Sequence, residues 1–565
     1  MTPVDHAPGL ASEIERWSEP GGPFDPDLLA RHDEAGSFPA EACAALDGRG
    51  LPAQYVPVRH GGRLERLDRL QAELREVAAR DVTVAVAHGK TFLGAVSVWI
   101  GGDPAQAGGL ARHVLAGEAV SWGLTEPDHG SDLLSGELTA VRDGAGWRLN
   151  GRKWPVNNAT RGRFLCVLAR TEEAGGPRGF SVFLVDKREL AGGAVLPLPK
   201  LPTHGIRGAD ISGAEFVDAL VPGHALIGAE GHGIELSLKS LQLTRTACVA
   251  LSLGAGDHGL RLLRRFLGER MLHGRQLADL PHARVVAGRA VARLMLAESL
   301  AAASTAVAHE APGELAAVSA IAKALAPTLV QGQLRLIGDL LGARSFLRDV
   351  GGYGAFGKLD RDHQIVSIFD GSTWVNRSAL AAHLPLLART PATAPGSGRV
   401  ADWLRADRTP APLDTDALLS LSRGDTVLGA LDALAAGVDP ERSGGADRPA
   451  RALAAAKREL LDAVRTLRPA AGAPATATMR LAETYEWCWA GAAALALWTA
   501  NPDRAEDDWW RGGSWLRGCL ALVLEQVGDG TGERPDAVFD ELGRLLLSDA
   551  GAHASLLRQP LEDLR

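Results

Sequence analysis

The chain is poor in cysteine, the residue on which zinc-bound and disulfide-stapled domains depend. No two of its five cysteines form a Cys-x-x-Cys pair, which argues against a zinc site and against a disulfide framework. An odd number of scattered thiols instead fits buried cysteines in a reducing compartment. We therefore expect no metal and a cytoplasmic location; the five residues are Cys43, Cys166, Cys248, Cys488 and Cys519.

An excess of positive charge and a long hydrophobic run are also missing. The formal net charge is −8, so we expect no nucleic-acid partner, which would require a broad cationic surface. The most apolar stretch, Ala490–Ala500, is shorter than the ~20 residues that cross a bilayer, and the first residues carry no signal-peptide pattern. We expect no membrane span. With 46% hydrophobic and 23% charged residues, the composition is that of a soluble globular protein of several domains.

The hydrophobic pattern divides the first part of the chain into a helical and a β segment. Residues 1–117 read as a helical domain, because Leu67–Ala87 carries apolar residues at helical spacing. Residues 118–225 read as a β domain, in which Trp147–Gly151 predicts a strand that ends in an Asn-Gly hairpin turn. Further short runs rich in β-forming residues are Phe164–Leu168, Phe180–Val185 and Glu215–Leu220.

Helical patterns return in the rest of the chain. Residues 226–388 carry long amphipathic or apolar stretches, among them Ile234–Leu253, Ala283–His309, Glu314–Gly338 and Val375–Leu387. Residues 389–414 hold several prolines and read as a linker with a short helix at Val400–Arg405. Residues 415–565 are helical again and carry six tryptophans, which we expect in a helical core or, alternatively, at a buried helix–helix interface.

These segments predict a mostly α fold with a central β domain. The expected parts are an N-terminal helical bundle, a middle antiparallel β barrel or sandwich, a C-terminal four-helix bundle and an extra helical domain. The predicted boundaries are 1–117, 118–225, 226–388, 389–414 and 415–565.

A loop suited to ligand binding lies where the helical pattern changes to strands. Residues Leu124–Asp132 read Leu-Thr-Glu-Pro-Asp-His-Gly-Ser-Asp. Gly130 lets the backbone approach a ligand, and the Ser131 hydroxyl can donate to a phosphate. A plain surface loop is the alternative. The later segment Asn150–Ala159, Asn-Gly-Arg-Lys-Trp-Pro-Val-Asn-Asn-Ala, makes the ligand-binding interpretation more specific.

A carboxylate stands in a second loop, which precedes an apolar helical run. Residues Ile368–Thr373 read Ile-Phe-Asp-Gly-Ser-Thr. Asp370 is a candidate base for removing a proton beside a thioester carbonyl. Asp-Gly-Ser-Thr is also a good capping sequence, so a helix N-cap is the alternative role of Asp370.

Together these segments resemble the flavin-binding signature and the catalytic loop of the acyl-CoA dehydrogenase family, over roughly residues 20–390. The family usually has a Glu at the position of Asp370. The resemblance implies FAD as the cofactor, Asp370 as the base over the substrate α-carbon and Arg245 near the thioester pocket. The cofactor-binding residues that it implies are Leu124, Thr125, Gly130, Ser131, Asn157, Arg270, Gly342 and Thr373.

Several of these positions depart from the family pattern. Asn157 replaces a Thr that faces the flavin N5 edge, but its amide can still donate a hydrogen bond. Pro155 replaces a Trp, and the nearby Trp154 has ordinary core packing as its alternative role. For Arg245, the alternative is a surface or capping Arg.

The family's cross-subunit cofactor contacts are altered as well. Arg270 suits a bidentate phosphate contact, and Gly342 is kept. His273 stands in place of a Phe, and Pro281 and Asp339 in place of two Gln residues, so we expect altered affinity for the adenine end of FAD.

Three functions are consistent with the sequence. The leading hypothesis is FAD-dependent α,β-dehydrogenation of an acyl thioester of coenzyme A or an acyl carrier protein. An electron-transfer partner or oxygen would be the acceptor, in a biosynthetic role. The second hypothesis is a flavin monooxygenase on the same fold, against which the carboxylate of Asp370 argues. The third is a non-catalytic scaffold. Very-long-chain members of the family have a similarly placed helical extension and form dimers, so we expect a homodimer.

Overall fold

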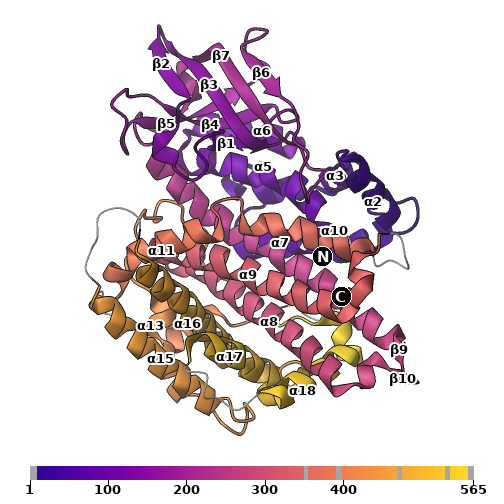
Figure 1. The fold of residues 1–565 in the computed structure, drawn as a ribbon. Coiled ribbons are helices and arrows are strands. Elements are labelled where there is room, and N and C mark those ends of the chain that lie inside the picture. The colour runs from indigo at the N-terminus through magenta and orange to yellow at the C-terminus, as the bar shows by residue number, and fades with distance from the viewer. Residues whose placement is uncertain (1–8, 349–353, 390–396, 468–473, 529–534, 558–565) are drawn as a thin grey trace, which may run out of the picture. The chain divides into compact units, whose positions relative to one another are not determined.

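The computed structural model describes residues 9–348, 354–389, 397–467, 474–528 and 535–557 (Figure 1). The chain forms two compact units. We call Glu13–Ala247 the N-terminal unit, and Met1–Ser12 together with Cys248–Arg565 the C-terminal unit. The finer domain boundaries stay predictions, and residues 390–396 of the predicted linker lie outside the described residues.

Short helices open the chain and are followed by two longer ones. The pattern over Leu67–Ala87 proves to be two helices, because Asp81 accepts a hydrogen bond from the Val84 N–H at 2.9 Å and starts a new helix as its N-cap. The helices are α1 Leu10–Trp17, α2 Pro26–Ala35, α3 Ala40–Arg49, α4 Leu67–Ala78, α5 Val82–Gly101 and α6 Pro104–Leu115.

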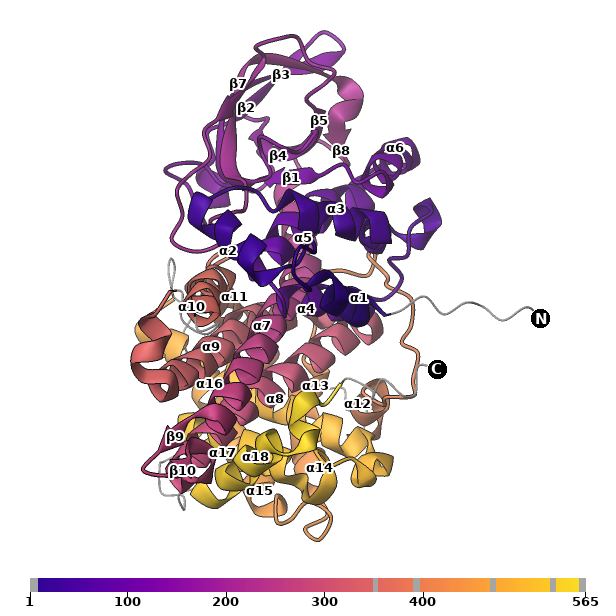
Figure 2. The same ribbon diagram turned by 90° about the vertical axis from the view of Figure 1, so that its right-hand side faces the viewer.

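The strands of the N-terminal unit form one eight-stranded sheet. Its main path is β6-β7-β3-β2-β4-β5-β8, and β1 pairs with β4. Most pairs are antiparallel, whereas β1 and β2 run parallel to β4. The sheet curls strongly (Figure 2), and the barrel or sandwich layout stays a prediction. The strands are β1 Val120–Gly123, β2 Thr139–Asp143, β3 Gly146–Asn157, β4 Phe164–Arg170, β5 Phe180–Asp186, β6 Val195–Leu198, β7 Ile211–Pro222 and β8 Leu226–Ile227.

The predicted Asn-Gly hairpin turn is wrong. Strand β3 runs straight through Asn150 and Gly151, and its pairing with β7 shifts register there. Asn150 Oδ1 accepts from the Asp218 N–H at 2.8 Å, and Gly151 has a φ of +130°. A Cβ on Gly151 would lie 2.8 Å from the Leu138 Cα, so glycine is required by this close approach. The dipeptide therefore marks a β-bulge, the other structure that Gly in a strand commonly signals.

The C-terminal unit is built from helices, apart from one small hairpin in its described part. Helix α8 packs along α9, α16, α17 and α18, and α11 packs between α9 and α16. The helices predicted over 234–253, 283–309 and 375–387 lie within longer observed helices, and the one predicted over 314–338 lies within α9 apart from Glu314. Helix α7, Gly233–Glu269, belongs to the N-terminal unit up to Ala247 and to the C-terminal unit from Cys248. The elements that follow it are β9 Met271–Leu272, β10 Arg275–Gln276, α8 Pro281–Glu310, α9 Leu315–Leu341, α10 Gly354–Gln364, α11 Thr373–Leu387, α12 Ser397–Trp403, α13 Thr426–Gly429, α14 Leu431–Ala436, α15 Asp447–Arg465, α16 Thr476–Ala500, α17 Ser514–Val527 and α18 Asp536–Leu547.

The mostly helical fold with a central sheet is confirmed, and the C-terminal tryptophans form helical core as predicted. Trp498, Trp510 and Trp515 pack on one another with ring centroids 5.2–6.0 Å apart. All five cysteines are buried and outside any disulfide. The four-helix arrangement stays a prediction.

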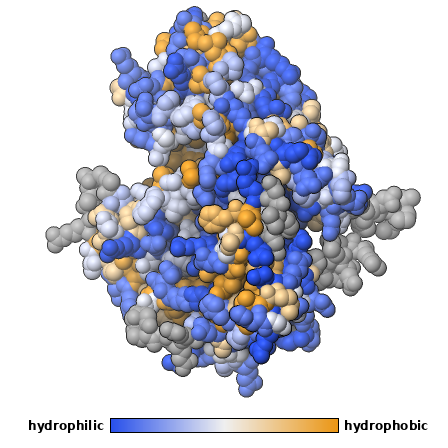
Figure 3. Space-filling model, turned by 45° about the vertical axis from the view of Figure 1, so that its right-hand side comes forward, coloured by the Kyte–Doolittle hydropathy of each residue, from blue (hydrophilic) through white to orange (hydrophobic). Residues whose placement is uncertain are grey.

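The surface is largely hydrophilic on the face seen in Figure 3, where apolar residues form separate patches. Three segments are nevertheless long and apolar enough to cross a membrane by length and composition: Val82–Gly101, Pro281–Glu310 and Pro312–Phe346. Inside the protein, 83%, 89% and 78% of their most apolar windows are buried. The expected absence of a membrane span stays a prediction.

Candidate functional site

The loop Leu124–Glu126 of the N-terminal unit is held by a buried ion pair. Lys153 on β3 is 1% exposed, and its Nζ donates to Glu126 Oε1 at 2.6 Å and to the Leu124 carbonyl at 3.1 Å. Glu126 also accepts from the backbone N–H groups of Glu137 and Leu138. Burial acts to raise the pKa of Glu126, but Lys153 and these donors outweigh it and hold the pKa below its usual value.

Neutral hydrogen bonds join the same loop to the strand segment that the sequence singled out. Thr125 Oγ1 donates to the Pro155 carbonyl at 3.0 Å, and the Trp154 N–H donates to the Thr125 carbonyl at 3.0 Å. The structure thus brings together the two N-terminal motifs. Trp154 is only partly buried, which argues against its alternative role as ordinary core.

Asn157 lies at the end of β3 and has an unusual hydrogen-bonding state. Its Nδ2 donates to the Val86 carbonyl on α5 at 3.2 Å. Its Oδ1 is buried, and no partner for it exists among the described residues. A buried amide oxygen normally has a donor, so this atom is poised to accept one from a ligand.

The loop from Pro127 to Asp132 is mostly exposed, including Gly130 and Ser131. No atom lies within 4 Å of a Cβ built on Gly130. The backbone there is open to approach, as the sequence predicted.

In the C-terminal unit, Asp370 stands in the turn before α11. It has a φ of +55° and is followed by Gly371 at +89°. The N-cap of α11 is Ser372, whose hydroxyl accepts from the Val375 N–H at 3.3 Å. The alternative role of Asp370 as the N-cap is therefore wrong. Its carboxylate instead accepts a hydrogen bond from the Cys248 thiol, with 3.4 Å between Sγ and Oδ2.

A buried lysine on α9, which we did not predict, contacts this loop. Lys323 is 0% exposed. Its Nζ donates to the Val366 carbonyl at 2.6 Å and to the Gly371 carbonyl at 3.5 Å, and lies 4.8 Å from the centroid of the Phe369 ring. The available signal was a single Lys inside the apolar run Ala320-Ile-Ala-Lys-Ala-Leu-Ala326.

Next to this lysine, His363 anchors the end of α10. Its Nδ1 lies 2.7 Å from Gln331 Oε1, and its Nε2 lies 3.0 Å from Ser252 Oγ. Burial, and secondarily the charge of Lys323, lowers the pKa of His363 to about 3. The imidazole is therefore neutral near pH 7.

The remaining predicted residues lie on or next to α7, α9, α11 and β9. Arg245 on α7 is 8% exposed, so its alternative role as a surface Arg is wrong. Thr373 is the first residue of α11, and Gly342 ends α9 with a φ of +57°. Arg270 directly precedes β9. Figures 1 and 2 both show β9 apart from α11 within the C-terminal unit, so the strand after Arg270 does not lie beside the helix after Asp370.

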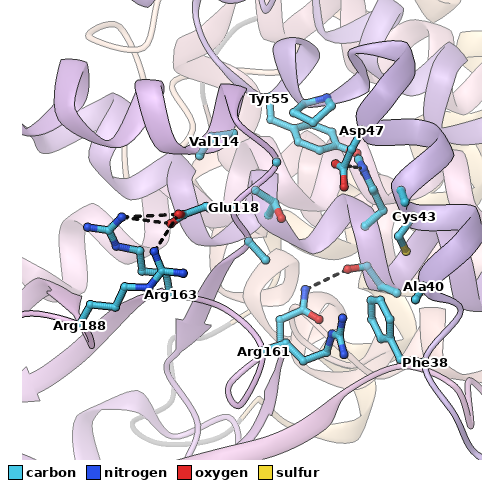
Figure 4. A pocket seen from close by; sticks show the side chains of 18 residues that line it. Phe38, Ala40, Cys43, Asp47, Tyr55, Val114, Glu118, Arg161, Arg163 and Arg188 are labelled. Carbon is cyan, nitrogen blue, oxygen red and sulfur yellow. Dashed lines mark hydrogen bonds and ion pairs between the residues drawn. The ribbon is translucent and has the colours of Figure 1, made fainter.

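The N-terminal unit also contains a cavity of about 380 Å³, lined by polar and apolar side chains, that the sequence did not indicate (Figure 4). On one side, Tyr55 Oη lies 2.7 Å from His88 Nδ1, and His88 Nε2 lies 3.0 Å from Asp47 Oδ1. Asn158, the neighbour of Asn157, lines the same cavity. The three linked side chains come from α3, η1 (Leu51–Tyr55) and α5, so no local motif announces them.

Comparisons with known proteins agree with these motifs. Two family models match: "Acyl-CoA dehydrogenase, middle domain" over residues 121–219 and "Acyl-CoA dehydrogenase, C-terminal domain" over residues 231–384. The "Probable acyl-CoA dehydrogenase FadE25" of Mycobacterium tuberculosis is 25% identical over 360 residues, which is 63% of this chain and 90% of that protein.

Two solved structures share the fold. An acyl-CoA dehydrogenase from Bacillus anthracis, complexed with FAD, matches with a TM-score of 0.68 at 17% identity, over 96% of this chain and 94% of that one. The prolyl acyl carrier protein oxidase AnaB matches with a TM-score of 0.60 at 19% identity, over 66% of this chain and 97% of that one.

The fold, with helices around a central sheet, and the matched segments together define the protein as a flavin-dependent oxidoreductase. The chain belongs to the acyl-CoA dehydrogenase family, and it is an enzyme of that family. The resemblance inferred from the sequence is confirmed.

Proposed function

We propose that the protein binds FAD and dehydrogenates an acyl thioester between its α and β carbons, with Asp370 as the base. The residues present fit a flavin. Asn157 offers a buried acceptor that lacks a partner among the described residues, which suits a ring N–H donor. Leu124 and Thr125 are fixed beside it through β3, and Gly130 and Ser131 offer an open backbone and a hydroxyl to the pyrophosphate.

The reaction needs one base at the α carbon and an acceptor for two electrons. Asp370 would remove the α-proton, and donors to the thioester carbonyl would stabilise the enolate character that develops. Bound FAD supplies the oxidant that takes the β-hydride, so the product is an α,β-unsaturated thioester. The observation that carries this proposal is the position of Asp370, in a left-handed turn just before α11 and not at its N-cap.

Two arginines would serve the substrate and the cofactor. Arg245 is buried on α7, in keeping with a role at a thioester pocket. Strand β9, which follows Arg270, lies apart from α11 in the same chain, whereas Arg270 suits a diphosphate contact. A homodimer, in which Arg270 of one subunit reaches the cofactor of the other, reconciles these two facts.

The carrier and the electron acceptor complete the proposal. Acyl-CoA is the substrate class of the family, and an acyl carrier protein is the alternative carrier, because a prolyl acyl carrier protein oxidase shares the fold. An electron-transfer partner or oxygen would reoxidise the flavin. We further propose a cytoplasmic location and a biosynthetic role.

The product decides between these possibilities. FAD-loaded protein would be incubated with matched acyl-CoA and acyl-carrier-protein thioesters and an artificial electron acceptor, and the products analysed by mass spectrometry. Loss of two hydrogens from the acyl group supports dehydrogenation and identifies the carrier. A product that contains an added oxygen atom, and that forms only when reduced flavin and oxygen are present, would support the monooxygenase hypothesis over dehydrogenation. A protein that cannot be loaded with FAD would point to a scaffold.

A further inference from the structure

We propose that Lys323 is a positioning residue that fixes the main chain on both sides of Asp370. The kinetic consequence of this role rests on the proposed function of Asp370, whereas the contacts themselves do not. Lys323 reaches the loop from α9, a helix that contributes no other group to the chemistry proposed above.

The contacts of Lys323 bracket the candidate base. Val366 lies before Asp370 and Gly371 directly after it, and the carbonyls of both accept hydrogen bonds from Lys323 Nζ. The Phe369 ring, next to Asp370 on the other side, lies 4.8 Å from the same ammonium group. One cation therefore contacts the loop at three points within six residues.

The buried ammonium group of Lys323 stabilises the loop around Asp370 only while the loop holds its carbonyl acceptors in place. Removing a lysine charge from water costs several kcal/mol unless hydrogen bonds and favourable charges compensate for it. An ammonium group has three donors, and its bonds to carbonyl oxygens are charge-assisted and stronger than neutral ones. If the loop moved, Lys323 would lose these acceptors, so the cost of burying the charge opposes movement of the loop.

The loop needs such support because its backbone is strained. L residues rarely adopt the left-handed region in which Asp370 lies, with a φ of +55°. Asn376 Nδ2 also donates to the Gly371 carbonyl at 2.7 Å, so that carbonyl is held from two sides. Asp has a shorter side chain than the Glu usual in the family, and its reach is therefore set closely by the main chain.

Hydrogen–deuterium exchange of the FAD-loaded protein tests the proposal without any substrate. The variant Lys323→Met removes the charge and the donors but keeps an unbranched side chain. We expect exchange of the amides in residues 366–372 to become ~10-fold faster or more, since the opening of this segment would lose charge-assisted bonds. Lys323→Arg, which keeps a cation with donors, should restore part of the protection.

Lys457, which lies on α15, provides a matched control. Lys457 is 5% exposed and paired with Asp432, away from the loop. Lys457→Met should leave exchange of residues 366–372 unchanged. If Lys323→Met does not fold, Lys323→Gln, which keeps a neutral donor, replaces it. Unchanged exchange of the loop in a folded Lys323 variant would overturn the proposal.

Kinetics then separate positioning from a general loss of structure. With an acyl thioester that the unmodified protein oxidises, Lys323→Met should lower kcat by ~10–100-fold, because a misplacement of about 1 Å costs on the order of 10²-fold. KM should change little, and an α-deuterated substrate should show a larger isotope effect than with the unmodified protein. An unchanged kcat with a raised KM would contradict the proposal. If no thioester is oxidised even by the unmodified protein, the proposed function fails, while the exchange measurement still decides the role of Lys323.

Discussion

Both units fasten a functional loop with a buried lysine that donates to a main-chain carbonyl, and in the N-terminal unit the lysine binds a carboxylate as well. In the N-terminal unit, Lys153 pairs with the carboxylate of Glu126, which in turn receives two backbone N–H groups. In the C-terminal unit, Lys323 donates to main-chain carbonyls on either side of Asp370. An anchor on the main chain fixes the path of a loop whatever its side chains are. These main-chain bonds hold the turn that presents Asp370, at the position where the family usually has Glu.

The largest effect should come from replacing the side chain of Asp370. Asp370→Asn removes the proposed base, and substrate-driven flavin reduction should slow by ~10³-fold or more, within the range that a general base contributes. The protein should still fold and hold FAD, because the Val366 and Gly371 carbonyls still accept from Lys323 when the Asp370 carboxylate becomes an amide of the same size. Anaerobic stopped-flow spectroscopy measures the rate, and Asp370→Glu serves as the comparison that keeps a carboxylate. Reduction of Asp370→Asn at the rate of the unmodified protein would refute the assignment.

The buried ion pair of Lys153 and Glu126 should contribute strongly to the free energy of unfolding. Lys153→Met leaves the buried carboxylate of Glu126 without its counter-ion, so the free energy of unfolding should fall by ~3–5 kcal/mol. Urea denaturation measures the loss. Adding Glu126→Gln should recover part of it, because a neutral amide needs no counter-ion. A loss below ~0.5 kcal/mol in Lys153→Met would show that the pair does not hold this loop.

The free energy of unfolding should depend on pH through His363 of the C-terminal unit. Its pKa is about 3 in the folded protein against 6.5 in the unfolded chain, so the unfolded state binds more protons between these values. The stabilisation is complete above about pH 6.5 and is lost as the pH falls toward 3. Measurements of unfolding by urea across this range should show a loss of ~2–4 kcal/mol from this group. His363→Gln should flatten that part of the curve, and an unchanged slope would contradict the burial of a neutral imidazole.

The smallest effect should come from a neutral bond at the N-terminal loop. Thr125→Val removes the hydroxyl that donates to the Pro155 carbonyl, and should lower the free energy of unfolding by ~1 kcal/mol, the usual net value of such a bond. Thr484→Val, which removes a hydroxyl that donates to the Arg480 carbonyl of the same helix, α16, is the matched control and should change stability less. Equal losses in both variants would mean that the loop gains nothing particular from Thr125.

Local patterns predicted the regular elements well. Strands such as Phe180–Val185 and helices such as Val375–Leu387 follow from period and composition, and the structure has both. Where the sequence misled, a local signal had two structural uses. Asn150-Gly151 fits a hairpin turn or a bulge, and only the pairing of β3 with β7 selects the bulge.

Contacts across the chain explain what the sequence could not predict. The sequence indicated the site around Glu126 and Lys153, because both residues fall within the two segments that resemble the family's flavin-binding signature. The contact of Lys323 with the Val366 and Gly371 carbonyls joins segments more than 40 residues apart and uses backbone acceptors, which have no sequence signature. The same holds for the cavity lined by Tyr55, His88 and Asp47, whose side chains come from separate elements.

The central claim is that this chain oxidises an acyl thioester. Its most direct test is the visible spectrum of purified, FAD-loaded protein, mixed without oxygen with a broad panel of saturated acyl-CoA and acyl-carrier-protein thioesters. We expect that at least one member bleaches the flavin absorbance of the unmodified protein, and that the same member leaves Asp370→Asn oxidised. A flavin that stays oxidised in the unmodified protein across the whole panel would contradict the central claim.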